Sequence, residues 1–417
     1  MPRPRRSFAR AGACPGLLRV ALALLLLLPL AGCAGILRLD APPAEATVDL
    51  PVLGLPNARF WPDGPPEPLQ REVALMLARQ GALQAGAAGR ALPPAHFLAL
   101  SGGGDNGAYG AGLLTGWTAS GTRPRFDIVT GISAGALIAP FAFLGPDYDP
   151  QLREVFTEMA PPDLILLRRL PVAVLFNDSL ADTSPLLRLI QRHADGAMLA
   201  AIAREYAEGR LLLIGTTNLD LQRPVVWNIG AIAASGHPDA LTLFRKILLA
   251  SASIPGAFPP VLVDVEYAGR AFQEMHVDGG AAAQVFLYPP SLDLRGVTGP
   301  RRMPRPRTIW VIRNGRIDIE GASVSRGLFS IARRSIATLL HFSGVGDISR
   351  IYLTAQRDGI DFRLSYIGSN FAAERREPFD QRFMQALFDY AEAKARAGTA
   401  WVAAPPTAGT RPATADR

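Results

Sequence analysis

The sequence predicts a three-layer α/β fold with a largely parallel central sheet and helices on both faces. Two observations support this prediction. Between residues 96 and 144, a short apolar run, a glycine turn and a stretch of helical character follow one another twice. The chain is also long enough, at 417 residues with 49% hydrophobic side chains, to bury a large core. Because ligands bind such sheets at the carboxyl ends of strands, the two glycine turns mark the expected site.

Individual elements follow from the same patterns. The apolar residues 96–100 predict a strand, and the small residues 106–117 predict the helix after it. Residues 126–130 predict a second strand that runs into Gly131, with a very apolar helix over 134–144 behind it. The remaining expected elements are strands at 211–216, 225–229 and 308–312 and helices at 239–252, 323–340 and 378–397.

The chain begins like a secreted lipoprotein. Five arginines precede the apolar run 20–30, which is too short for a helix of ~20 residues that spans a bilayer. Leu30-Ala31-Gly32-Cys33 resembles a bacterial lipobox, which implies that residues 1–32 are a cleaved signal peptide and that Cys33 is lipidated. Ala34 in place of Asp implies an outer-membrane lipoprotein of the bacterial cell envelope, facing the periplasm. A plain secretory peptide is the alternative, and the choice between Sec and twin-arginine export stays open.

Charge and composition exclude other classes. The five leader arginines have no acids beside them, so removing them from the formal charge of +7 leaves +2. No dense basic stripe remains, and we expect no nucleic-acid partner. No His-Glu-x-x-His motif, paired cysteines or acidic cluster has metal-ligand spacing, so we expect no metal and no cofactor. Cys14 leaves with the leader, so the mature chain cannot form an internal disulfide.

Composition divides the mature chain into three parts. Residues 33–68 contain eight prolines and predict an extended tether, in which Phe60 and Trp61 offer contacts along the body. Residues 69–401 predict the folded α/β domain, in which the strand and helix signals alternate. Residues 402–417 consist mostly of Ala, Pro, Thr and Arg and predict a disordered tail.

Three glycine-flanked motifs in a fixed order outline an active site. Gly131-Ile132-Ser133-Ala134-Gly135 places Ser133 where a buried strand turns directly into a helix, and its flanking glycines leave room for the chain to fold back. Asp278-Gly279-Gly280 can place a carboxylate that activates the serine. The other interpretation of the serine motif is a glycine-rich turn in an ordinary strand–helix unit.

The earliest motif is Ser101-Gly102-Gly103-Gly104-Asp105-Asn106-Gly107, whose backbone N–H groups can bind an oxyanion. A strand-to-helix connection that needs positive φ is one alternative, and a phosphate cradle is another. The loop does not fit Gly-x-x-x-x-Gly-Lys-Ser/Thr, and it does not fit Gly-x-Gly-x-x-Gly with an acidic partner. Nucleotide binding is therefore the weaker interpretation.

With a fourth block, these motifs resemble the patatin-like phospholipases. Residues 250–261, Ala-Ser-Ala-Ser-Ile-Pro-Gly-Ala-Phe-Pro-Pro-Val, are similar to the family's Phe-Pro-Pro segment, and the resemblance covers roughly residues 96–290. It implies a patatin-like fold and a Ser–Asp dyad, with Ser133 as nucleophile and Asp278 as base. The resemblance also implies an oxyanion hole formed by Gly102, Gly103 and Gly104. The supporting positions that it implies are Asn106, Gly131, Gly135, Gly279 and Gly280.

One position departs from the family. Patatin-like proteins usually carry Arg or Lys two residues after the third glycine, where this chain has Asn106 preceded by Asp105. Asn106 can donate hydrogen bonds but adds no positive charge, and Asp105 adds a negative charge. We therefore expect weaker support of an oxyanion or altered recognition of a phosphate head group.

Histidine provides an independent criterion. A conventional Ser-His-Asp enzyme needs a base downstream of the serine, which leaves His237 and His341 as candidates. His276 lies two residues before Asp278, so on a strand both would share a face, and His276 could orient the carboxylate or be a structural residue. The remaining histidines are His96 and His193. No histidine lies in a loop of obvious chemistry, so the dyad interpretation is favoured.

The expected function is membrane-anchored hydrolysis of a lipid or another acyl ester, of phospholipase A type, with the membrane as partner through the N-terminal lipid anchor. The alternative is a catalytically weak envelope lipoprotein that serves as a scaffold or lipid-binding module. Asp105-Asn106 favours the alternative, whereas Ser133 and Asp278 favour the enzyme. The apolar segment 164–176 predicts either a lid with an acyl-chain surface or a core helix and strand.

Overall fold

The computed structural model describes six stretches of the chain, residues 38–85, 92–158, 166–167, 181–292, 305–319 and 321–406. The chain separates into two compact units, residues 1–39 and residues 40–417, and the fold described below belongs to the second. The leader, Cys33, nearly all of segment 164–176 and residues 407–417 lie outside the described residues. The predictions of lipidation, of a lid and of a disordered tail therefore stay predictions.

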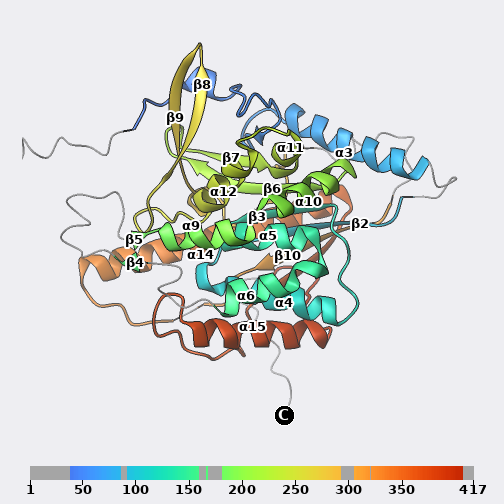
Figure 1. Ribbon diagram of the computed structural model, residues 1–417. Helices are drawn as coiled ribbons and strands as arrows, with labels where there is room; N and C mark the ends of the chain where they lie inside the picture. The colour runs from blue at the N-terminus through green and yellow to red at the C-terminus, as the bar shows by residue number, and fades with distance from the viewer. Residues whose placement is uncertain are drawn as a thin grey trace, which may run out of the picture. The chain divides into compact units, whose positions relative to one another are not determined.

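A mixed nine-stranded sheet forms the centre of the described part of the chain (Figure 1). Its main strand order is β1-β7-β6-β3-β2-β10-β11, and β9 pairs with both β6 and β8. Strands β6, β3, β2, β10 and β11 are parallel, whereas β1, β7, β8 and β9 pair antiparallel at one side. The strands are β1 Arg59–Phe60, β2 Ala95–Leu100, β3 Ile128–Ile132, β6 Leu211–Asn218, β7 Arg223–Asn228, β8 Val261–Tyr267, β9 Arg270–Asp278, β10 Arg307–Arg313 and β11 Asp361–Tyr366, with β4 Leu166–Leu167 and β5 Ala181–Asp182 in a separate pair.

Helices cover the sheet because its strands are apolar on both faces. In β2, Leu98 and Leu100 join one hydrophobic core, and Phe97 and Ala99 join a second core on the opposite face. This arrangement confirms the predicted α/β class. The helices are α2 Ala44–Thr47, α3 Glu67–Ala85, α4 Gly107–Ala119, α5 Ala134–Leu144, α6 Asp149–Thr157, α9 Ser184–His193, α10 Gly196–Ala207, α11 Ile229–Ala234, α12 Ala240–Ser251, α14 Leu328–Asp358 and α15 Gln381–Arg396, with short 3₁₀ turns at Gly104–Asn106, Pro146–Tyr148 and Gly279–Ala281.

The proline-rich segment differs from the extended tether that composition predicts. Residues 40–66 pack on the body, where α2 and β1 form and Arg59 of β1 pairs with Trp227 of β7. Phe60 and Trp61 are buried. The edge strand β1 contains no proline, so the N–H groups that the neighbouring prolines lack are not needed for its pairing with β7. The aliphatic and aromatic residues between the prolines therefore determine the packing.

Other element boundaries also shift. The helix expected at 323–340 begins at Leu328 and continues to Asp358, and Val402, at the start of the expected tail, pairs with Leu364. The β8–β9 hairpin was not expected, because the inward-facing residues of β9 include Glu274, His276 and Asp278. Polar residues on the buried face hide the hydrophobic alternation that normally indicates a strand.

Candidate active site

Ser133 occupies a strained turn between β3 and α5. Its backbone has φ 55° and ψ −125°, in the left-handed half of conformational space that a residue with a side chain rarely adopts. The Ser133 N–H donates to Ser251 Oγ at 3.0 Å, and Ser251 Oγ donates to the carbonyl of Gly215 at 2.7 Å. These contacts from α12 and β6 hold the turn, so the serine side chain has a fixed position at the start of a helix.

The glycines beside Ser133 are required by close backbone approaches. A Cβ atom at Gly131 would overlap the carbonyl oxygen of Gly135, and one at Gly135 would overlap the carbonyl oxygen of Leu100. Any larger residue at either position would push helix α5 away from the end of β2. The sharp strand-to-helix turn therefore explains the Gly-x-Ser-x-Gly spacing.

Asp278 ends β9 and meets Ser133, although 145 residues separate the two in the sequence. The Ser133 hydroxyl hydrogen-bonds to the Asp278 carboxyl group, and the Gly280 N–H donates to Asp278 Oδ1 at 2.7 Å. Burial raises the pKa of Asp278. The hydrogen bonds from Ser133 and Gly280 lower the pKa by less than burial raises it, and the result is about 7. Both partners are neutral, so the carboxyl group can exchange a proton near neutral pH.

The glycine loop offers fewer free N–H groups than expected. The Gly102 N–H donates to the carbonyl of Gln284 at 2.9 Å, so it is not available to an oxyanion in this conformation. Within the described residues, the N–H groups of Gly103 and Gly104 have no acceptor. Gly104 has φ +59° and lines the cavity at Ser133. The prediction that all three glycines donate is therefore narrowed to Gly103 and Gly104.

Asn314, at the end of β10, fixes this loop from behind. Its side-chain amide donates to the carbonyl of Ser101 at 2.7 Å, and its side-chain oxygen accepts from the Gly110 N–H at 3.0 Å. A Cβ atom at Gly103 would overlap the Asn314 carbonyl oxygen. The loop therefore needs glycine for packing as well as for unhindered N–H groups.

The charge of Asp105 is compensated within the fold. Arg375 Nη1 lies 2.9 Å and 3.1 Å from the two carboxylate oxygens of Asp105, and the Phe379 N–H donates to Asp105 Oδ2 at 3.2 Å. Asp105 adds the expected negative charge, but Arg375, from 270 residues away, pairs with it; the expected change in oxyanion support stays a prediction. Asn106 is half-buried and its side chain makes no capping bond to α4.

A small apolar cavity of about 50 Å³ opens beside the serine. A second cavity of about 30 Å³ shares four of its apolar lining residues and extends to His193. The shared residues are Leu137, Val155, Leu186 and Leu189. Both cavities are much smaller than the ~300–1,000 Å³ of a typical ligand site, so in this conformation they offer an apolar lining for the first carbons of an acyl chain beside the serine and no room for a whole chain.

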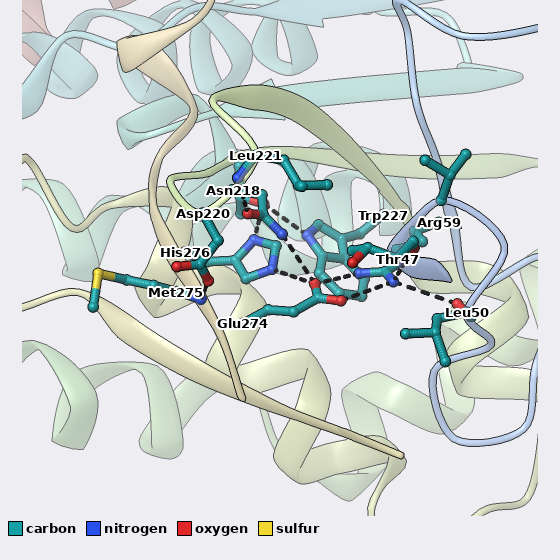
Figure 2. Close-up of polar contacts among 12 residues, drawn as sticks. Thr47, Leu50, Arg59, Asn218, Asp220, Leu221, Trp227, Glu274, Met275 and His276 are labelled. Atoms are coloured by element: carbon teal, nitrogen blue, oxygen red, sulfur yellow. Dashed lines mark hydrogen bonds and ion pairs between the residues drawn. The ribbon is translucent and has the colours of Figure 1, made fainter. Parts of the chain in front are cut away.

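His276 belongs to a buried network that does not include the dyad (Figure 2). Trp227 Nε1 donates to Thr216 Oγ1 at 2.8 Å, and Thr216 Oγ1 lies 3.0 Å from His276 Nδ1. His276 Nε2 lies 3.1 Å from Glu274 Oε2. Burial lowers the pKa of His276, so the neutral ring, with the proton on Nε2, satisfies every bond in this series. The structural interpretation of His276 holds, and it does not orient Asp278.

Glu274 is the charged centre of that network (Figure 2). Arg59 Nη2 donates to Glu274 Oε1 at 3.0 Å, and Asn218 Nδ2 donates to Glu274 Oε2 at 3.2 Å. Burial alone would raise the pKa of Glu274, but the hydrogen bond from His276 and the charge and hydrogen bonds of Arg59 lower it to about 2. Arg59 comes from the proline-rich segment, so this ion pair fixes that segment to the hairpin.

The other histidines lie away from Ser133 and Asp278. His96 accepts a bond from Trp310 Nε1, and burial lowers the pKa of His96 and of His193. His237 accepts the N–H of Asp239, and His341 stacks its ring edge-on against Phe342 on α14. All five histidines are among the described residues, and none hydrogen-bonds to Ser133 or Asp278.

Four supporting residues escaped the sequence analysis: Ser251, Gln284, Asn314 and Arg375. Ser251 lies in the Ala/Ser-rich block at 250–261, which could have indicated it. Asn314 and Arg375 bond to residues more than 200 positions away in the sequence. Gln284 acts on Gly102 through its backbone carbonyl, so its side-chain type does not indicate this contact. Their positions depend on the tertiary structure alone.

Comparison with known proteins adds a family to this geometry. Residues 98–289 match the family model described as patatin-like phospholipase, and no curated protein matches the chain. VipD from Legionella pneumophila matches with 10% identity, over 74% of this chain and 67% of its own, at a TM-score of 0.31. Human GIVD cytosolic phospholipase A2 matches with 11% identity, over 75% of this chain and 51% of its own, at a TM-score of 0.27. The type III effector protein ExoU matches with 13% identity, over 74% of this chain and 54% of its own, at a TM-score of 0.20. The chain thus spans about half the length of the last two proteins.

Proposed function

This chain belongs to the patatin-like phospholipase family through residues 98–289, and we propose that it cleaves acyl esters of lipids with Ser133 as the nucleophile and Asp278 as the general base. One observation supports this assignment of roles most directly. The buried Asp278 carboxyl group hydrogen-bonds to the Ser133 hydroxyl, and burial raises the pKa of Asp278 to about 7. A base of that pKa can take the serine proton at neutral pH and return it later.

The reaction follows from these positions. Ser133 Oγ attacks the ester carbonyl carbon while Asp278 takes its proton, and the N–H groups of Gly103 and Gly104 bind the oxyanion. Asp278 then protonates the leaving alkoxide, and the acyl group stays on Ser133 with its first carbons against the apolar lining beside the serine. Asp278 takes a proton from water, which attacks the acyl-enzyme carbonyl; the bond to Ser133 Oγ then breaks, Asp278 returns the proton to Oγ, and the fatty acid leaves.

The scaffold alternative has lost one of its two arguments. It rested on the Asp105-Asn106 pair, and Arg375 balances the charge of Asp105, while Asn106 still stands where the family usually carries a cation. We retain the proposed lipid anchor at Cys33 and the location in the bacterial cell envelope, at the outer membrane. In cells, Cys33→Ser should move the protein out of the membrane fraction while the body stays folded, and unchanged fractionation of this variant would contradict the anchor.

The test of the chemistry uses a fluorophosphonate probe and a panel of phospholipid, lysophospholipid and neutral esters. The wild type should be labelled, and peptide mapping should find the label on Ser133. Ser133→Ala should lose both labelling and turnover. Ser349→Ala is the matched control, because Ser349 Oγ bonds only within its own helix, to the carbonyl of Val345. If the folded wild type and Ser133→Ala are equally inactive on every ester, the hydrolase proposal fails.

A further inference from the structure

Helix α14 consists of two halves with different surroundings. Its second half, residues 344–358, packs on the body through seven buried residues, whereas none of residues 328–343 is buried. The change occurs at Gly344, where a Cβ atom would lie 2.8 Å from the guanidinium group of Arg313. In Figure 1, the first half of the orange helix α14 extends outward from the central sheet. We call residues 328–343 the outer half of α14.

The outer half exposes large apolar side chains on one side. Phe329 is 83% exposed, Leu328 79% and Leu339 70%. At 3.6 residues per turn these positions fall within one half of the helix circumference, together with the exposed Ile331, Ile336, Leu340 and Phe342. A monomeric protein rarely leaves a contiguous apolar patch of this kind in water. These 16 residues gain no packing energy within the described fold, so a partner surface would stabilise them.

Charge identifies the kind of partner. Arg333, Arg334 and His341 occupy the opposite half of the circumference, Arg326 lies two residues before the helix, and residues 321–346 contain no Asp or Glu. A second copy of this chain would bring like charges together at the edges of the apolar patch. An anionic lipid surface instead accepts the apolar side chains among its acyl chains and pairs its head groups with the arginines. No helix among the described residues is long and apolar enough to cross a membrane, so the outer half would lie in the plane of the surface.

We infer that the outer half of α14 is a docking helix for an anionic lipid bilayer. This inference rests on the proposed function, because the same lipid surface supplies the ester. The packed half of α14 is connected to the candidate active site through hydrogen bonds of Asp347 and Gln284. Asp347 Oδ2 accepts the Gln284 N–H at 2.7 Å, the Gln284 carbonyl accepts the Gly102 N–H, and Gln284 Nε2 donates to the Gly280 carbonyl. The docking helix and the loops around Ser133 are therefore held by one scaffold.

The first experiment measures hydrogen exchange of the full chain with and without vesicles of equal parts phosphatidylglycerol and phosphatidylcholine. Amides of residues 328–343 should exchange at least tenfold more slowly with vesicles present. This readout is local, so lipid binding by the N-terminal leader does not imitate it. Unchanged exchange in these amides with vesicles bound would overturn the inference.

The second experiment compares variants by vesicle sedimentation in the same full-chain background. Leu339→Ser combined with Phe342→Ser should weaken partitioning by roughly tenfold or more, because each change removes an apolar side chain from lipid. Arg333→Gln should weaken binding to anionic vesicles about fivefold and should not affect neutral vesicles. Leu353→Ser is the matched control, since Leu353 is 67% exposed on the same helix but lies outside its outer half. Because the N-terminal leader can also bind lipid, the variants are compared by hydrogen exchange of residues 328–343 as well, and equal protection of these amides by vesicles in all variants would contradict a docking helix.

Two further outcomes identify another partner and overturn the inference. Protection of 328–343 that rises with protein concentration without vesicles would assign this surface to a second copy of the chain. Protection at every dilution without vesicles would assign it to another segment of the same chain.

Turnover of a soluble short-chain ester separates this inference from the proposed function. The docking variants should keep this turnover, and Ser133→Ala should lose it. If vesicle binding holds while no ester is cleaved, only the proposed function fails.

Discussion

Strand β9 carries two buried carboxyl groups on one face, and they are in opposite electrostatic states. Glu274 faces Arg59, and its pKa is lowered to about 2. Asp278, four residues later, faces only the neutral Ser133 hydroxyl and Gly280 N–H, and burial raises its pKa to about 7. The same strand and the same burial therefore produce a permanent anion at one end and a proton acceptor at the other. The difference depends on whether a cation lies opposite.

The largest effect should come from removing the proton acceptor. Asp278→Asn keeps an oxygen for the Gly280 N–H but cannot take the serine proton, so turnover should fall by ~10² to 10⁴. The variant should be at least as stable as the wild type at pH 8. Between about pH 4 and 7 the folded state holds a proton that the unfolded state has released. The free energy of unfolding of the wild type therefore falls as the pH rises through this range, and above about pH 7 it keeps the full cost of the ionised, buried Asp278.

Ester turnover and urea unfolding of Asp278→Asn check both parts of this prediction. Asp278→Asn with near wild-type turnover would exclude Asp278 as the base. A large loss of stability at pH 8 would place Asp278 with Glu274 as a structural anion.

The next effect concerns the structural anion. Arg59→Met leaves Glu274 buried with only neutral partners, which should lower the free energy of unfolding by about 3–5 kcal/mol. The stability that Glu274 contributes is present above its unfolded pKa of 4.5 and should be lost as the pH falls towards 2, where the folded carboxylate takes up its proton. Turnover of the folded Arg59→Met variant should stay near that of the wild type.

Lys246→Met is the control for this change. The Lys246–Asp264 pair joins at 2.7 Å but is solvent-exposed, so its loss should cost less than about 1 kcal/mol. Urea titration gives both values. If Arg59→Met is as stable as Lys246→Met, the buried ion pair does not fix the N-terminal segment to the hairpin.

The pH dependence of hydrolysis should reflect the raised pKa of Asp278. Only the ionised carboxylate accepts the serine proton, so kcat/KM for a soluble ester should rise with pH to a plateau above about 7, with a roughly tenfold change per pH unit below it. A histidine would give a similar limb, so His193→Ala, His237→Ala and His341→Ala serve as controls. Loss of the limb in any of them would favour a conventional triad, and a profile that is flat down to pH 5 would contradict the raised pKa.

The smallest effect concerns Asp105, a buried carboxylate that resembles Glu274 because it has an arginine. Arg375→Gln should lower turnover only a few-fold, since Arg375 is half-exposed and water screens the pair. Asp105→Asn combined with Arg375→Gln should restore turnover, because no unpaired charge remains beside the oxyanion loop. Steady-state kinetics of the two variants and the wild type measure this. A large rise in turnover for Asp105→Asn alone would show that its charge reaches the reacting oxygen.

The sequence by itself determined the α/β class and the two strand–glycine–helix turns. These are local properties: a short apolar run predicts a strand, and a sharp turn into a helix accepts only glycine at Gly131 and Gly135. Motif order also placed Ser133 and Asp278 as candidates before any contact between them was known. Local sequence patterns were sufficient to predict those features whose physical cause is a residue close by in the sequence.

Only the tertiary structure decided what stands opposite each polar group. Asp105 is paired because Arg375 arrives from 270 residues away, and the Gly102 N–H is occupied because Gln284 lies against it. Arg59 makes Glu274 a structural anion, and the absence of a cation among the partners of Asp278 leaves that carboxyl group titratable. Charge state depends on the nearest partner and on burial, and both are set by residues that the fold brings together from distant parts of the chain.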